Sequence, residues 1–198
     1  MSKVFSALSV SVDGYITGRD PGDGRGLGDG SMLFDWYFDG DTPSTVFDGF
    51  RLSGPSARVF DALSARVGAS LAGRNTYDDS GRFGDDAGPH PTAPLVVLSH
   101  RPAPRMTGRQ TLVTTGIEDA VAAARQVAGD KDVALMGGGV VTEALAAGLV
   151  DELVLHQVPV LLGAGRPFFR ELPGHVALRL VEAVPAPGVT HLHYAVER

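Results

Sequence analysis

Two short stretches place an arginine and a hydroxyl directly after an apolar run. In "LAGRNTY", residues 71–77, Arg74 and Thr76 follow apolar residues, and in "VLSHRP", residues 97–102, Ser99, His100 and Arg101 do the same. A guanidinium beside a hydroxyl suits a phosphate group, more so where a helix begins and its free N–H groups point outward. An ordinary helix cap and a solvent-exposed loop are the alternatives for these two stretches.

A third stretch, "VALMGGGVVTEAL" at residues 133–145, contains three consecutive glycines, Gly137, Gly138 and Gly139. Glycine loses more backbone freedom on folding than other residues, so this run needs a physical reason. Backbone amides without side chains can approach a pyrophosphate closely. Tight packing of a helix on a strand is the alternative, and the run matches neither the GxGxxG fingerprint nor a Walker loop. Three such junctions in one chain favour a nucleotide-binding site.

The elements around these stretches alternate between strands and helices. The patterns predict strands at 4–12, 68–73, 94–99, 111–115, 132–136 and 151–160, helices at 55–67, 74–81, 117–127 and 140–147, and a terminal hairpin at 177–197. We expect Thr115 to cap the helix that starts at 117, and Gly148 to end the helix at 140–147. This order predicts an α/β domain with a mostly parallel sheet, which binds ligands beyond the carboxyl ends of its strands.

Composition narrows the function classes. The 198 residues are 43% hydrophobic, a size and content that suit a single folded domain. A net charge of −6 argues against nucleic acid as a partner, and the absence of cysteine excludes disulfides, thiolate zinc sites and a cysteine nucleophile. No metal site is predicted. Without a signal peptide or a long apolar run, we predict a soluble cytoplasmic protein with no membrane contact.

Residues 18–52 are harder to interpret. "GRDPGDGRGLGDG", residues 18–30, is rich in glycine and aspartate, which predicts a mobile surface loop, either a lid or a solvated linker. Aromatic residues follow within a short stretch, but their spacing predicts no secondary structure.

Taken together, the motifs resemble the dihydrofolate reductase-like family. Within that family they look most like the branch similar to the reductase domain of the bifunctional riboflavin-biosynthesis deaminase-reductase. The resemblance rests on "SVDGYI" at 11–16, "GRNTYD" at 73–78, "VVLSHRP" at 96–102, "LMGGG" at 135–139 and "GLVDELVLHQVPVLLGAGRPFF" at 148–169. It implies a central sheet of about eight strands with an antiparallel C-terminal hairpin and helices on both faces. It also implies a homodimer that uses NADPH to reduce a C=N or C=O of a small heterocyclic substrate.

Site residues follow from the same resemblance. Ser9 and Ile16 would flank the nicotinamide, Arg74 and Thr76 would hold phosphates, Ser99, His100 and Arg101 would meet the 2′-phosphate, and Gly137, Gly138 and Gly139 would lie against the pyrophosphate. At the substrate end the pattern departs from folate reductases. Asp35 is the nearest match to their acidic residue, with a surface aspartate as the alternative, and Trp36 and Phe38 would pack the substrate ring.

His156 falls on the strand that faces the substrate in the family. A proton-relaying histidine and a hydrogen-bonded core histidine are both compatible with its apolar neighbours. The leading hypothesis is therefore an NADPH-dependent reductase that acts on a pterin- or ribosylaminopyrimidine-like molecule. A non-catalytic nucleotide-binding or sensory module is the alternative, and NADH could replace NADPH if Ser99 and Arg101 do not reach a 2′-phosphate.

Overall fold

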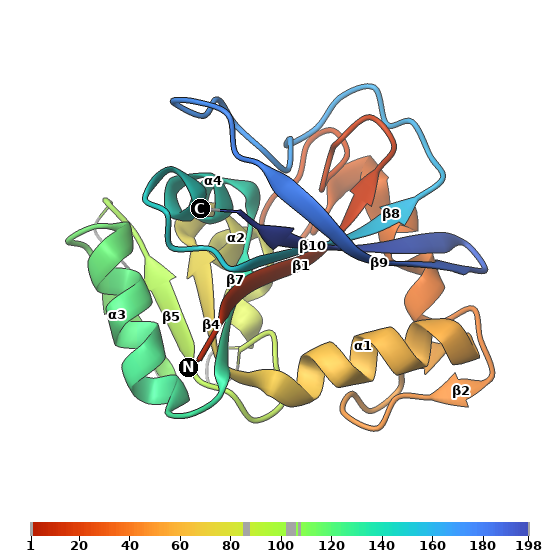
Figure 1. Cartoon of the computed structure of the whole chain (residues 1–198), viewed down its shortest axis with the longest axis horizontal. Coiled ribbons are helices and arrows are strands. Elements are labelled where there is room, and N and C mark those ends of the chain that lie inside the picture. The colour runs from red at the N-terminus through yellow and green to blue at the C-terminus, as the bar shows by residue number, and fades with distance from the viewer. Residues whose placement is uncertain (1, 85–87, 102–105, 107, 198) are drawn as a thin grey trace.

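A computed structural model describes residues 2–84, 88–101, 106 and 108–197. Its centre is an eight-stranded sheet in the order β6-β5-β4-β7-β1-β8-β10-β9. The strands are β1 Val4–Ser11, β4 Val67–Gly73, β5 Leu95–Leu98, β6 Gln110–Val113, β7 Asp132–Met136, β8 Glu152–Val158, β9 Leu178–Ala186 and β10 Val189–Val196. The first six run parallel, and the β9–β10 hairpin adds an antiparallel edge beside β8 (Figure 1). The predicted sheet is confirmed.

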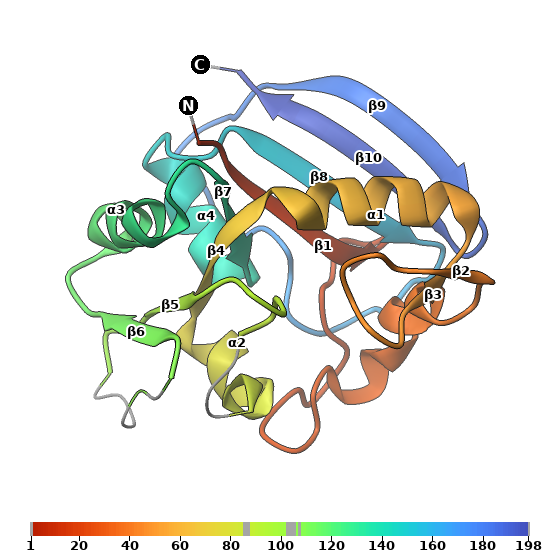
Figure 2. The ribbon, with the colours of Figure 1, turned by 90° about the horizontal axis from the view of Figure 1, so that it is seen from below.

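Helices cover both faces of the sheet. They are α1 Gly54–Arg66, α2 Arg74–Asp79, α3 Ile117–Ala128 and α4 Gly138–Ala146, with the 3-10 helices η1 Gly28–Tyr37 and η2 Gly81–Phe83. The α1 and α2 helices pack on one face, and α3 and α4 pack on the other (Figures 1 and 2). This division follows from right-handed crossovers between parallel strands. The chain crosses the sheet toward β6 through α1 and α2, and returns toward β8 through α3 and α4, so the two pairs of helices lie on opposite faces.

Alternating side chains divide the core between the two faces. On β1, Val4 and Val10 join the cluster beneath α3 and α4, while Phe5 lies in the cluster beneath α1. Buried apolar residues fill β5 without alternation, as expected for a parallel strand covered on both faces. The helix α1 begins with a serine cap, Ser53, whose hydroxyl accepts from the backbone N–H of Ser56.

Two helix starts differ from the sequence prediction. The residue before α3 is Gly116, which makes no side-chain cap hydrogen bond, so the prediction of a Thr115 cap is wrong. The helix α4 starts at Gly138, two residues earlier than predicted, and its first turn therefore contains two of the three glycines. Gly148 follows the helix with φ +67, the left-handed conformation that ends helices, as predicted.

Residues 18–52 form a turn, a 3-10 helix and a short two-stranded sheet. A turn bridged between Gly22 and Gly26 precedes η1, and the short strands β2 Thr42–Pro43 and β3 Arg51–Leu52 pair antiparallel after it. The η1 helix buries Leu33 and Trp36. Within the described part of the chain, no helix is both long enough and apolar enough to cross a membrane.

Candidate cofactor-binding site

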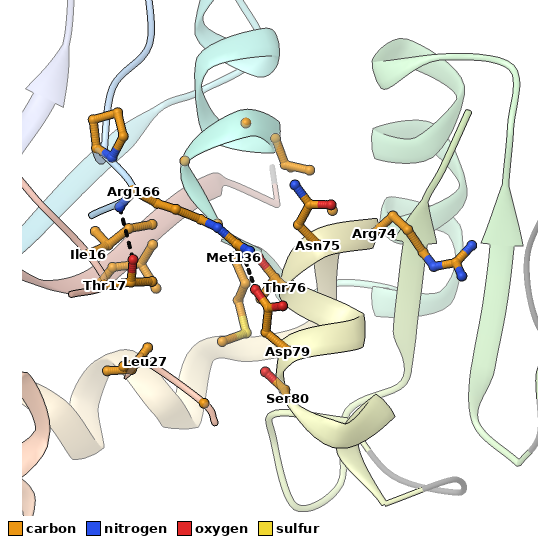
Figure 3. A pocket seen from close by; sticks show the side chains of 18 of the residues that line it. Ile16, Thr17, Leu27, Arg74, Asn75, Thr76, Asp79, Ser80, Met136 and Arg166 are labelled. Carbon is orange, nitrogen blue, oxygen red and sulfur yellow. Dashed lines mark hydrogen bonds and ion pairs between the residues drawn. The ribbon is translucent and has the colours of Figure 1, made fainter. Parts of the chain in front are cut away.

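A cavity of about 680 Å³ opens at the carboxyl edge of the sheet, beyond the ends of β1, β4, β5 and β7 (Figure 3). The structure brings ten sequence-predicted residues together on its walls: Ser9, Ile16, Arg74, Thr76, Ser99, His100, Arg101, Gly137, Gly138 and Gly139. They come from four separate strand ends, which the parallel sheet aligns along one edge.

Two guanidinium groups gather around Asp78 on α2. The Nε atom of Arg74 donates to both carboxylate oxygens of Asp78 at 2.9 Å. Arg101 donates from Nη2 to the Asn75 side-chain oxygen at 2.8 Å and lies 3.7 Å from Asp78. Two cations and one carboxylate leave a net positive charge at this end of the cavity, which suits an anionic group.

Ser99 fixes the turn that presents Arg101. Its buried hydroxyl donates to the Arg101 carbonyl at 3.0 Å and accepts from the Arg101 backbone N–H at 3.2 Å. The backbone N–H of Ser99 donates to the Val113 carbonyl at 3.0 Å, which ties the turn to β6. The serine therefore acts on the position of the arginine as well as lining the cavity.

Two of the three glycines leave room for atoms of the protein itself. Gly137 has φ +95, and a Cβ there would lie 2.2 Å from the Thr76 hydroxyl oxygen. A Cβ on Gly138 would lie 2.5 and 2.6 Å from the carbonyl oxygens of Pro167 and Phe168. At Gly139 a Cβ would meet a guanidinium at 3.4 Å, that of Arg170 in the same loop. Close packing thus explains Gly137 and Gly138, whereas a Cβ on Gly139 would make only an ordinary contact with a flexible side chain. All three glycines line the cavity.

The loop after β8 is hydrogen-bonded to the loop after β1. The Asp13 carboxylate accepts from the backbone N–H groups of Leu162 and Gly163 at 3.1 and 2.7 Å. A hydrogen bond from Ser11 is the main cause that holds the pKa of Asp13 below its usual value, and these two backbone donors contribute. The Ile16 N–H donates to the Arg166 carbonyl at 2.9 Å, so the two loops form one wall.

An ion pair crosses the cavity from that wall to α2. The Arg166 guanidinium donates from Nη1 to the Asp79 carboxylate, and both residues line the cavity (Figure 3). The Arg166 backbone N–H donates to the Thr17 hydroxyl at 2.9 Å. Sequence reasoning did not single out this pair, because the two residues are 87 positions apart and only the fold brings them together.

The four predicted substrate-side residues lie elsewhere. Asp35 and Phe38 are exposed, Trp36 and His156 are buried, and none of these four is among the described residues that line the cavity. Among the described residues of segment 18–52, Leu27 and the η1 residues Ser31 and Phe34 line the cavity instead. Leu27 and the 3-10 geometry of η1 could not be inferred from the aromatic pattern, because 3-10 helices lack the 3.6-residue period.

A buried polar row lies behind the cavity. Ser9, His156 and His191 are register partners on the adjacent strands β1, β8 and β10. The Nδ1 atoms of the two histidines are 2.8 Å apart, and His191 Nε2 lies 3.0 Å from the Ser56 hydroxyl. Trp36 packs against both imidazoles and donates from its indole nitrogen to the Ser9 hydroxyl at 3.0 Å.

Burial keeps this histidine pair neutral. Desolvation, followed by the charge of the other imidazole, lowers the pKa of His156 to about 3. Desolvation, followed by the charge of Arg58, lowers the pKa of His191 to about 4. A hydrogen bond between the Nδ1 atoms requires one ring to donate and the other to accept, which two neutral tautomers satisfy. Sequence reasoning missed His191, because its alternating "THLHY" context is that of an ordinary strand with one polar face.

Comparisons with known proteins agree with this architecture. Residues 2–192 match the model of the RibD C-terminal domain family. The protein YwjB of Bacillus subtilis (strain 168) is 24% identical over 194 residues, which are 97% of each chain. A crystal structure of a Shewanella sp. PV-4 protein assigned to riboflavin biosynthesis has 27% identity, full coverage of both chains and a TM-score of 0.71.

A dihydrofolate reductase shares the fold. The Enterococcus faecalis enzyme, solved in complex with NADP(H) and RAB-propyl, has 17% identity and a TM-score of 0.61. The match covers 99% of this chain and 97% of that one. The expected dihydrofolate reductase-like, reductase-type fold is confirmed, and the chain belongs to the RibD C-terminal domain family.

Proposed function

We propose that this protein is an NADPH-dependent reductase that transfers hydride to a C=N or C=O bond of a small heterocyclic substrate. The observation that carries the proposal is the convergence of ten residues, expected at a nicotinamide dinucleotide, on one cavity of about 680 Å³. The donor set also fits NADPH. It supplies backbone amides at Gly137–Gly139, hydroxyls at Thr76 and Ser99, and two guanidinium groups near the strand ends.

The chain's own residues would bind and orient the cofactor. Arg74 and Arg101 would pair with the 2′-phosphate, and the Gly138 and Gly139 amides with the pyrophosphate. Ser9 and Ile16 would border the nicotinamide. When bound, the cofactor supplies the hydride, so the protein need only align the ring with the acceptor and exclude water.

The proposed substrate is a flat pterin- or ribosylaminopyrimidine-like molecule, held between the nicotinamide position and η1. Phe34 and Leu27 offer apolar contacts there, and Ser31 offers a hydroxyl. This choice of substrate class rests on family membership and on the dihydrofolate reductase fold. A homodimer is proposed on the same grounds, and light scattering of the purified protein would test it.

The test uses Trp36, the single tryptophan of the chain. Tryptophan emission overlaps nicotinamide absorption, and Trp36 contacts the cavity residue Ser9, so NADPH binding should quench its fluorescence by energy transfer. Loss of nicotinamide absorbance with pterins, ribosylaminopyrimidines or simple carbonyls would then demonstrate turnover. Absence of both quenching and turnover rejects the proposal.

A non-catalytic nucleotide-binding or sensory module is the second candidate. The observation that favours it is the position of Asp35 and His156, since neither candidate proton donor is among the described residues that line the cavity. NADPH binding without turnover on any of these substrate classes would favour this module. Turnover with NADH in preference to NADPH would instead indicate an NADH-dependent reductase.

A further inference from the structure

The ion pair between Asp79 and Arg166 lies inside the cavity rather than on the outer surface. The side chains are 16% and 33% exposed, and the arginine runs from the loop after β8 toward α2, which also carries Thr76 (Figure 3). Both residues line the cavity that the proposed function assigns to NADPH. A cofactor that enters must therefore meet this pair.

The glycine end of the cavity has one flanking cation, Arg170, whose guanidinium lies 3.4 Å from the position of a Cβ on Gly139. The first turn of α4 consists of Gly138, Gly139, Val140 and Val141, so the helix start offers backbone dipoles and no cation of its own. The hydroxyl of Thr76 is neutral as well. Arg74 and Arg101 are engaged around Asp78 at the strand ends. A pyrophosphate carries two negative charges, and a guanidinium is the side chain best suited to neutralise them in a partly buried site.

Arg166 has the freedom to make that contact. Its backbone is held on both sides, by the Ile16 N–H on its carbonyl and by the Thr17 hydroxyl on its own N–H. The side chain can change partners without any movement of the loop, because several rotatable bonds separate the guanidinium from this fixed backbone. One of its five N–H donors is engaged by Asp79, and an anion in the cavity would compete with that carboxylate.

We propose that Arg166 binds the cofactor's pyrophosphate and that Asp79 is its counter-ion in the cofactor-free protein. On NADPH binding the guanidinium exchanges the Asp79 carboxylate for phosphate oxygens. Arg166 is then a binding residue, and Asp79 sets the affinity by competing for it. This inference rests on the proposed NADPH-dependent function.

The test measures NADPH dissociation constants by quenching of Trp36, with adenosine 2′-monophosphate as a competing probe that lacks the pyrophosphate. Arg166→Gln should weaken NADPH binding about tenfold to a hundredfold, the range of a lost charge-assisted hydrogen bond. Asp79→Asn should strengthen NADPH binding about twofold to fivefold, because it removes the competing charge of a partly exposed pair. Neither change should alter the affinity for adenosine 2′-monophosphate.

The surface pair Arg58–Glu182, which joins α1 to β9 at 3.2 Å, supplies matched controls. Arg58→Gln and Glu182→Gln make the same changes of charge away from the cavity and should leave NADPH binding within about twofold. Circular dichroism of all four variants checks that each is folded.

Several outcomes overturn the inference. Tighter NADPH binding by Arg166→Gln would show that the arginine hinders cofactor binding. Weaker binding by Asp79→Asn would show that the aspartate helps to position the arginine and does not compete for it. Unchanged binding in Arg166→Gln, with normal binding by the wild type, rejects this inference and leaves the proposed function intact. Failure of the wild type to bind NADPH rejects both.

Discussion

The indole nitrogen of Trp36 donates to the hydroxyl of Ser9 across 3.0 Å, and this bond joins the buried cluster beneath η1 to the cavity wall. Trp36 is 3% exposed, and Ser9 lines the cavity from the end of β1. The residue predicted to stack on a substrate thus lies one side chain behind the site. Its contribution is to hold the wall in place.

Replacing Trp36 with phenylalanine should lower the free energy of unfolding by about 2–4 kcal/mol, because packing volume and the indole donor are both lost. Urea unfolding followed by circular dichroism measures this loss. Combination with Ser9→Ala completes a double-mutant cycle. We expect a coupling energy of about 1 kcal/mol, and strictly additive effects would contradict the importance of this hydrogen bond.

Stability should fall as the pH drops below about 6.5. The pKa values of His156 and His191 lie at about 3 and about 4 in the folded chain, so in this window the unfolded chain binds protons that the folded chain does not. Each histidine can contribute a slope of up to about 1.4 kcal/mol per pH unit. Urea midpoints between pH 7.5 and about 4.5 would measure it. His191→Gln should reduce the slope, whereas the change of the exposed His175 to glutamine should not.

Gly138→Ala should destabilise the protein by about 2 kcal/mol or more, because the added Cβ would collide with the backbone carbonyls of Pro167 and Phe168. Thermal unfolding gives the measurement. Gly54→Ala is the matched control: it opens α1, its Cβ would meet nothing within 4 Å, and its effect should be neutral or slightly stabilising. Equal effects of the two substitutions would contradict the close approach seen at Gly138.

Cofactor preference should depend on the two arginines at the strand ends. Arg101→Ala and Arg74→Ala are each expected to weaken NADPH binding more than NADH binding, by about tenfold in the ratio of affinities, because only NADPH carries the 2′-phosphate. Quenching of Trp36 by the two cofactors provides the ratio. An equal loss for both cofactors in Arg101→Ala would reject the assignment of this residue to the 2′-phosphate.

Sequence reasoning predicted the sheet well because its signals are local. The apolar runs of β5 and β7, the 3–4 spacing of α1 and the turn between β9 and β10 each fit one periodicity. The grouping of the ten cavity residues was also predictable, because their motifs lie at or just after the ends of strands. Parallel strands bring such positions together whatever the length of chain between them.

The surroundings of the proposed substrate position were not predictable in the same way. Trp36 and Phe38 are two residues apart, yet Trp36 is buried in η1 and Phe38, which follows the end of that helix, is 59% exposed. In the sequence, His156 is the polar residue on a strand face that it shares with Val154 and Val158. Its partner is His191, 35 residues away, and only the pairing of β8 with β10 reveals that the two form a unit.

The close fit at Gly138 has a consequence for exchanging parts between relatives. The carbonyls of Pro167 and Phe168 occupy the space of its missing side chain, so the loop after β8 and the first turn of α4 pack together with complementary shapes. A chimaera that imports the loop from a relative should fold only when it also imports the matching turn. The unit that evolution or an engineer can transplant is the pair of segments, although more than twenty residues separate them in the chain.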